Sequence, residues 1–152
     1  MRIKNKAAMQ AFANVLATHL TAQNVILLDG DLGAGKTTLS QFIGRALGVK
    51  RHISSPTFNI IKSYRGDTLK FHHMDCYRLE HSDEDLGFDE FFDDDAVTVI
   101  EWSQFIQDYL PDQYLKITIQ VINEEERELV LEASGLHYEK IKEVLDHVQF
   151  TD

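Results

Sequence analysis

Residues 25–38 pass from an apolar run into a glycine-rich loop, and they read Val25-Ile26-Leu27-Leu28-Asp29-Gly30-Asp31-Leu32-Gly33-Ala34-Gly35-Lys36-Thr37-Thr38. The segment from Gly30 to Thr37, here called the phosphate loop, fits the pattern G-x-x-x-x-G-K-[ST] in full. The apolar run before it is typical of a strand buried on both faces. An amphipathic helix is predicted from about Lys36 to Leu47, with Gly48 at its end. This order of strand, loop and helix is the context that supports a phosphate-binding assignment.

The residue types of the loop suit the binding of phosphate. Gly33 and Gly35 allow positive φ angles that turn successive backbone N–H groups toward phosphate oxygens, and the helix directs its positive dipole end at the same oxygens. Lys36 reaches the β- and γ-phosphates, and the Thr37 hydroxyl is a Mg²⁺ ligand. The alternative is an ordinary turn with an exposed lysine. We expect nucleotide and Mg²⁺ to bind at Asp31, Leu32, Gly33, Ala34, Gly35, Lys36, Thr37 and Thr38.

The composition predicts one domain, residues 1–152. The chain has 43% hydrophobic residues, enough for a core, and no apolar run approaches the roughly 20 residues of a membrane-spanning helix. The N-terminal stretch lacks a signal-peptide core, and the single cysteine, Cys76, excludes an internal disulfide and fits a reducing compartment. We expect a cytoplasmic protein that makes no contact with a membrane.

The charge distribution disfavours direct binding of nucleic acid. The formal net charge is −10, and the 15 Lys and Arg residues form no basic cluster of the kind that grips a phosphate backbone. Acidic residues concentrate between Glu80 and Asp95. This acidic run indicates either a solvated surface or a docking face for a basic partner.

The rest of the pattern predicts a three-layer α/β domain of the P-loop NTPase type, with a mixed, largely parallel sheet flanked by helices. Asn5 is the expected cap of the first helix, and Gly66-Asp67 is the expected turn of a hairpin. The further predicted elements are a helix to about Leu20, extended segments at 57–64 and 69–77, a buried strand at 96–100, an amphipathic helix that ends before Pro111, strands at 115–122 and 128–131, and a helix at 136–148.

Two carboxylates are candidates for the metal and the attacking water. Glu101 ends the apolar run 96–100, and because the carboxyl ends of parallel strands meet at one edge, it is expected beside the phosphate loop. In the segment around Asp75, strand alternation places His73, Asp75 and Tyr77 on one face, where they would orient water or Mg²⁺. The alternatives are the exposed end of a strand for Glu101 and a polar network at a sheet edge for His73 and Asp75.

Roles follow from these positions. We predict Lys36, Asp75 and Glu101 as catalytic residues and Thr37, Asp75 and Glu101 as metal ligands; the sequence does not choose between the two carboxylates for the water. Thr57, in Ser54-Ser55-Pro56-Thr57, occupies the place where GTPases sense the γ-phosphate. We expect Trp102 to be a packing residue, and we expect Arg127 and the first helix to border the nucleotide base.

These motifs together resemble the bacterial TsaE (YjeE) family. The resemblance runs in order from about Asn24 to Pro111 and departs from the family at Cys76, where leucine is commoner. The segments that carry it are Gly30 to Thr38, Ser55-Pro56-Thr57-Phe58, His73-x-Asp75-x-Tyr77-Arg78-Leu79, Glu84-Asp85-Leu86-Gly87, Glu101-Trp102 and Leu110-Pro111.

The resemblance implies an ATPase that supports installation of threonylcarbamoyl on the adenosine next to the anticodon of certain tRNAs. It implies TsaD and TsaB as partners, and contact with tRNA only through them. Lys36 and Thr37 match the family's phosphate and magnesium residues. Thr57 matches its switch threonine, Asp75 its strand aspartate and Glu101 its Walker-B-like glutamate.

Two other classes remain as alternatives. A small-molecule kinase usually carries arginines over the phosphates on a lid, whereas no lid-sized insertion is visible and the arginines are scattered: Arg2, Arg45, Arg51, Arg65, Arg78 and Arg127. A GTPase-like switch protein typically has an N-K-x-D loop, but the only Asn-Lys pair is Asn5-Lys6. ATP is therefore favoured over GTP. Because no arginine is an obvious finger, with Arg78 the nearest candidate, hydrolysis is expected to be slow without partners.

Overall fold

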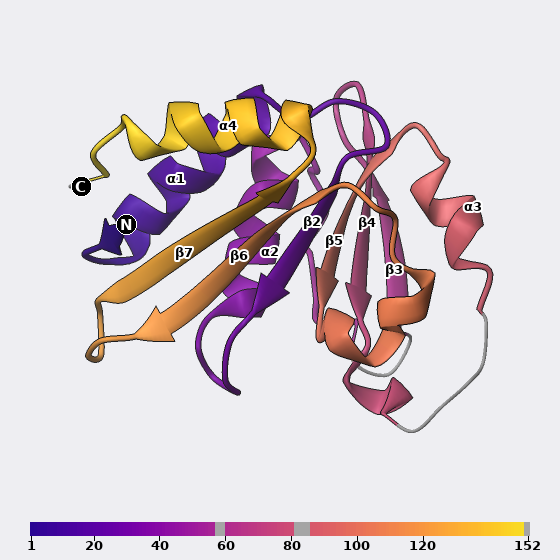
Figure 1. The fold of residues 1–152 in the computed structure, drawn as a ribbon, viewed down its shortest axis with the longest axis horizontal. Coiled ribbons are helices and arrows are strands. Elements are labelled where there is room, and N and C mark those ends of the chain that lie inside the picture. Colours follow the sequence, from indigo (N-terminus) through magenta and orange to yellow (C-terminus); the bar gives the residue numbers. More distant parts are fainter. Residues whose placement is uncertain (57–59, 81–85, 151–152) are drawn as a thin grey trace.

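The computed structural model describes residues 1–56, 60–80 and 86–150 (Figure 1). Strands, α-helices and short 3-10 helices (η) alternate along this part of the chain. None of its helices has the length and apolar character needed to cross a membrane. The elements in chain order are β1 (Arg2–Ile3), α1 (Lys6–Thr18), β2 (Val25–Asp29), α2 (Lys36–Ala46), β3 (Ile61–Arg65), β4 (Lys70–Asp75), η1 (Tyr77–Leu79), α3 (Phe88–Phe92), β5 (Ala96–Glu101), η2 (Ser103–Tyr109), β6 (Tyr114–Val121), β7 (Arg127–Ser134) and α4 (Leu136–Asp146).

The strands form one mixed sheet in the order β1-β7-β6-β2-β5-β4-β3, and Figure 1 shows β7 to β3 side by side. The four central strands, β6, β2, β5 and β4, are parallel to one another. Antiparallel pairs close both sides: β3 on β4, β7 on β6 and β1 on β7. The predicted mixed sheet with a parallel core is confirmed, and β3 and β4 form the predicted hairpin.

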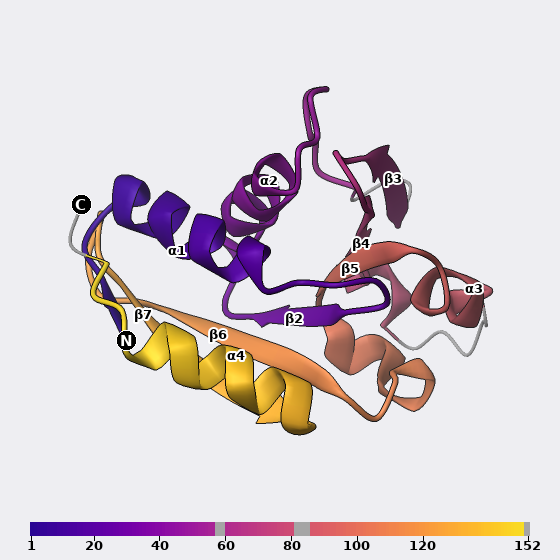
Figure 2. The same ribbon diagram turned by 90° about the horizontal axis from the view of Figure 1, so that it is seen from above.

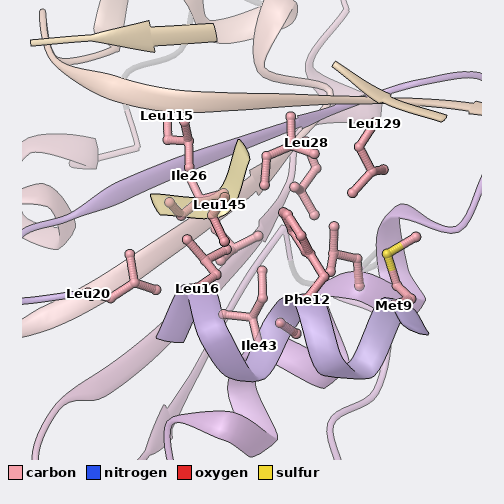
Figure 3. Close-up of a cluster of buried hydrophobic side chains, with 14 of the residues drawn as sticks. Met9, Phe12, Leu16, Leu20, Ile26, Leu28, Ile43, Leu115, Leu129 and Leu145 are labelled. Atoms are coloured by element: carbon pink, nitrogen blue, oxygen red, sulfur yellow. The ribbon is translucent and has the colours of Figure 1, made fainter. Parts of the chain in front are cut away.

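Both faces of β2 are buried because its side chains alternate between two hydrophobic clusters. Ile26 and Leu28 belong to the larger cluster, with α1, α2 and α4 (Figure 3). Val25 and Leu27 belong to the smaller one, with η1, α3 and η2. Figure 2 shows α1 and α2 on one side of β2. The central strand is thus held between two layers, so the loop that follows it begins from a fixed point.

Several segments differ from the sequence-based expectation. The strand predicted to Tyr77 ends at Asp75, whose side chain accepts a hydrogen bond from the Tyr77 backbone N–H at 3.0 Å and turns the chain. The amphipathic helix predicted after β5 is the 3-10 helix η2, which follows a left-handed Trp102 (φ 59°) and is interrupted at Ile106. The short elements β1 and α3 were not predicted.

Candidate functional site

The phosphate loop runs from the end of β2 to the start of α2. Gly33 and Gly35 have φ angles of 80° and 110°, and Gly35 directly precedes the helix. Gly30 has φ 147°, and a Cβ built on it would lie only 2.7 Å from the Ile119 carbonyl oxygen. Glycine at these positions therefore lets the loop pass close to β6 and turn its backbone into a conformation that other residues rarely adopt.

Lys36 is folded back onto its own loop. Its side chain is 5% exposed, and its Nζ donates to the carbonyls of Gly30 and Asp31. The same nitrogen lies 4.3 Å from the centroid of the Trp102 ring, within the range of a cation–π interaction. Burial lowers the pKa of Lys36, opposed chiefly by the negative charge of Glu101. Lys36 is therefore not exposed, contrary to the alternative of an ordinary turn with an exposed lysine, and phosphate binding at this loop stays a prediction.

Glu101 ends β5 in a buried position that joins α2 to the sheet. Glu101 is 2% exposed, so the alternative of an exposed strand end is wrong. Thr37 Oγ1 lies 3.1 Å from Oε1, Ser40 Oγ donates to Oε2 at 3.2 Å, and His73 Nε2 lies 2.6 Å from Oε2. A hydroxyl from the phosphate loop and a carboxylate from the neighbouring parallel strand are thus brought together, as strand order predicted.

Asp75 lies opposite Glu101 in the register of β4 and β5 and is 7% exposed. The expected grouping of His73, Asp75 and Tyr77 on one strand face is wrong for Tyr77, which lies in η1, is 42% exposed and packs its ring 4.9 Å from that of Trp102. The sheet-edge alternative also fails, because β3 covers the outer side of β4. Asp75 and Glu101 therefore remain together at the end of two adjacent parallel strands.

Two pockets adjoin the phosphate loop. The acidic pocket has a volume of about 320 Å³ and is lined by Leu32, Gly33, Gly35, Lys36, Thr37, Thr38, Ser55, Asp75, Glu101 and Trp102. The wide pocket has a volume of about 790 Å³ and is lined by Asn5, Lys6, Ala7, Met9, Gly33, Ala34, Gly35, Thr38, Glu124, Glu125 and Arg127. Gly33, Gly35 and Thr38 contribute to both. The loop therefore separates a small space lined by Asp75 and Glu101 from a larger one that Arg127 and the start of α1 line.

Segments that lie far apart in the sequence border the wide pocket. Arg127 Nε donates to the Ala34 carbonyl at 2.9 Å, which ties β7 to the loop. The Asn5 side chain accepts a hydrogen bond from the Ala8 backbone N–H at 2.9 Å and caps α1, as predicted. The start of α1 and Arg127 thus lie beside the loop, and their expected place at the border of the base stays a prediction.

The acidic pocket has the donor chemistry of a magnesium site. Mg²⁺ prefers hard oxygen ligands and is usually held by one or two carboxylates together with waters and substrate phosphates. Thr37, Asp75 and Glu101 offer such oxygens. Within residues 1–56, 60–80 and 86–150, no group of three or more His, Cys, Asp or Glu side chains forms an all-protein metal site. The predicted switch residue, Thr57, lies outside the described residues, although nearby Ser55 lines the pocket.

Two contacts at the site were not predicted from the sequence. Ser40 follows Lys36 by one helical turn, and its hydroxyl lies 2.9 Å from the Lys36 carbonyl oxygen and 3.2 Å from Glu101 Oε2. Helical spacing from Lys36 was the available signal. Trp102 was expected only to pack, and it packs on Lys36 itself as well as on Tyr77 and Phe105. Among the described residues, no arginine lines the acidic pocket, and Arg78 is exposed in η1.

Comparison with known proteins agrees with this geometry. The family model described as "Threonylcarbamoyl adenosine biosynthesis protein TsaE" matches residues 3–129, a span that includes the phosphate loop, Asp75 and Glu101. The chain belongs to the TsaE family. The resemblance drawn from the sequence motifs is thereby confirmed.

Individual TsaE relatives match most of the chain. The TsaE protein of Bacillus subtilis is 41% identical over 144 residues, which are 95% of this chain and 91% of the relative. The TsaE protein of Rickettsia felis is 34% identical over 128 residues, or 82% of this chain and 74% of the relative. A crystal structure of Bacillus subtilis YdiB superposes with a TM-score of 0.82 at 36% identity, covering 96% of this chain and 92% of that one. The fold and the TsaE assignment therefore agree.

Proposed function

We propose that this chain is the Mg²⁺-dependent ATP-binding and ATP-hydrolysing subunit of the machinery that adds threonylcarbamoyl to the adenosine next to the anticodon of tRNA. We propose further that it acts with TsaD- and TsaB-like proteins and meets tRNA only through them. The observation that carries the proposal is the junction of the phosphate loop with two buried carboxylates, in a chain of the TsaE family. The net charge of −10 supports contact with tRNA through partners.

The phosphates are proposed to lie along the loop. The backbone N–H groups at Gly33 and Gly35 and the positive end of α2 bind the phosphate oxygens. Lys36 leaves the carbonyls of its own loop and pairs with the β- and γ-phosphates, which restores a charged partner to a buried cation. The wide pocket adjoins the same glycines and has room for the nucleoside.

The acidic pocket is proposed to hold the metal and the reacting γ-phosphate. Mg²⁺, when bound, neutralises charge on the β- and γ-oxygens. Thr37 and either Glu101 or Asp75 hold it, directly or through water. One of the two carboxylates also orients the water that attacks the γ-phosphate. Glu101→Gln and Asp75→Asn separate these roles, because the variant that loses hydrolysis while keeping Mg²⁺-dependent binding identifies the water-orienting residue.

Slow hydrolysis by the isolated chain is part of the proposal. No described arginine lines the acidic pocket, and a cation supplied in trans accelerates phosphoryl transfer by about 10³-fold or more in related systems. We expect TsaD and TsaB together to raise the single-turnover rate of ATP hydrolysis. Equal rates with and without these proteins would contradict the proposal, as would unchanged hydrolysis in Lys36→Ala.

The same assay distinguishes the alternative classes. Transfer of labelled γ-phosphate to a nucleoside or nucleotide, in place of water, would indicate a kinase. Competition by GTP as strong as by ATP would indicate a switch protein without adenine preference. The proposal expects inorganic phosphate as the product and ATP as the stronger competitor.

A further inference from the structure

His73 contacts the site through Glu101 and not through either pocket. It lies in β4, its side chain is fully buried, and it is not one of the residues that line the acidic or the wide pocket. Its Nε2 is 2.6 Å from Glu101 Oε2, the shortest of the contacts that this carboxylate makes. Its own ring stacks on Phe71, with 5.9 Å between the centroids. The His73 ring is therefore packed against Phe71 and hydrogen-bonded through Nε2 to Glu101.

The partner of Nε2 defines which ring nitrogen donates. A carboxylate only accepts hydrogen bonds, so Nε2–H is the donor in the contact with Glu101. Nδ1 is buried and has no hydrogen-bond partner among the described residues. Glu101 is therefore the one hydrogen-bond partner of this ring within the described part of the chain.

The two oxygens of Glu101 have different sets of partners. Thr37 Oγ1 lies 3.1 Å from Oε1 and 3.3 Å from Oε2, whereas His73 Nε2 and Ser40 Oγ lie 2.6 and 3.2 Å from Oε2 alone. In the proposed function Thr37 turns to the metal, so its contacts with Glu101 are replaced. The contacts of His73 and Ser40 come from side chains that line neither pocket, and they persist. They hold Oε2 in the interior and leave Oε1 directed toward Thr37.

We propose that His73 is a positioning residue, which together with Ser40 fixes Glu101 so that Oε1 faces the metal position beside Thr37. This inference rests on the proposed function. It assigns His73 no contact with nucleotide or metal. Removal of an interaction that orients a metal-binding carboxylate typically costs about 10- to 100-fold in metal affinity or activity, and the effect should appear only where Mg²⁺ takes part.

The neighbouring residue, His72, provides a matched control. It is 3% exposed, lies on the opposite face of β4, and its Nε2 is 2.9 Å from the carboxylate of Asp94 while its Nδ1 is 2.7 Å from Ser63 Oγ. It thus resembles His73 in burial and in bonding to a carboxylate, but its partner Asp94, unlike Glu101, lines neither pocket adjoining the phosphate loop.

The first test compares His73→Leu, His73→Gln and His72→Leu by calorimetric titration of ATP with Mg²⁺ and with EDTA. We expect His73→Leu to lose about 10- to 100-fold of the Mg²⁺-dependent gain in affinity and to bind ATP in EDTA as the wild type does. His73→Gln, whose amide can still donate to Glu101, should recover most of the gain. His72→Leu should keep the gain even where its melting temperature falls. A full gain in His73→Leu, or an equal loss in His72→Leu, would overturn the inference.

The second test reads the contact in the wild-type protein without nucleotide. In ¹⁵N-histidine-labelled protein, we expect His73 to show a protonated Nε2 whose shift changes in Glu101→Gln. An unprotonated Nε2, or a ring unaffected by Glu101→Gln, would overturn the inference even if His73→Leu does not fold. If the wild type binds no ATP while His73 still shows the expected Nε2 signal, the proposed function fails and the contact between His73 and Glu101 stands.

Discussion

Two glycines of the phosphate loop should respond differently to alanine, although both have positive φ. A Cβ at Gly30 would lie 2.7 Å from the Ile119 carbonyl oxygen and 3.2 Å from Ala34 Cβ, whereas a Cβ at Gly33 would meet nothing within 4 Å. Gly30→Ala therefore adds a collision with the backbone of β6 to the strain of its φ angle. Gly33→Ala adds the strain alone.

The difference between the two variants contains the contribution of the close approach, together with the difference in strain between φ 147° at Gly30 and φ 80° at Gly33. A left-handed conformation costs an ordinary residue about 1–2 kcal/mol, and the gain from a stiffer unfolded chain applies to both variants. Crowding against a backbone atom adds about 1–3 kcal/mol at Gly30. For a domain of this size, Gly30→Ala should melt roughly 2–12 °C below Gly33→Ala.

Thermal unfolding of the wild type and both variants, followed by circular dichroism without nucleotide, measures this difference. The size of the interval reports how tightly the loop is pressed onto the sheet. Equal melting temperatures for the two variants, or a lower one for Gly33→Ala, would refute the reasoning that β6 fixes the start of the loop.

Three further predictions concern single side chains. The Cys76 thiol is buried, and desolvation raises its pKa to about 12. A thiol reagent at pH 8 should therefore modify Cys76 only as fast as the protein opens. Rapid labelling of the native protein would contradict this. The hydrogen bond with His72 is the largest of the causes that lower the pKa of Asp94. The stabilising effect of the lowered pKa is complete above the ordinary carboxyl pKa and is lost as pH falls through the lowered pKa. The free energy of unfolding should therefore fall less on acidification in Asp94→Asn than in the wild type. Trp102 is the only tryptophan, and Lys36 lies over its ring. ATP should therefore change the fluorescence emission of Trp102 in the wild type but not in Lys36→Ala. Unchanged emission while calorimetry detects ATP binding would contradict the proposal that Lys36 moves from its own loop to the phosphates.

The parts of the site that lie close together in sequence were predictable. The strand, loop and helix from residue 25 to Ala46 follow from a contiguous motif and its flanking periodicity. Glu101 was placed beside the loop because an apolar run ends there and parallel strands end at a common edge. These are local signals combined with one general rule of sheet geometry.

The parts that depend on strand order were not predictable from local pattern. The contact of His73 with Glu101 requires β4 beside β5, and alternation along the strand says only that His73 and Asp75 share a side. Tyr77 leaves the strand because the Asp75 side chain binds its backbone N–H, a competition that periodicity does not express. Trp102 in a left-handed conformation replaces the expected helix by η2.

The wide pocket also depends on strand order, which local sequence patterns do not predict. Its lining joins residues near Asn5 to residues near Arg127. The pairing of β1 with β7 brings these segments together, and β1 has only two residues, too few for a period to be recognised. The sequence grouped Arg127 with the first helix, but it did not predict the strand that joins them.

Calorimetric titration of ATP with Mg²⁺ into the purified protein, alone and with TsaD and TsaB, tests most directly whether the phosphate loop holds the triphosphate. The account predicts saturable binding at one site in the wild type and its loss in Lys36→Ala. An absence of heat in the wild type under both conditions, or an unchanged isotherm in Lys36→Ala, would contradict it.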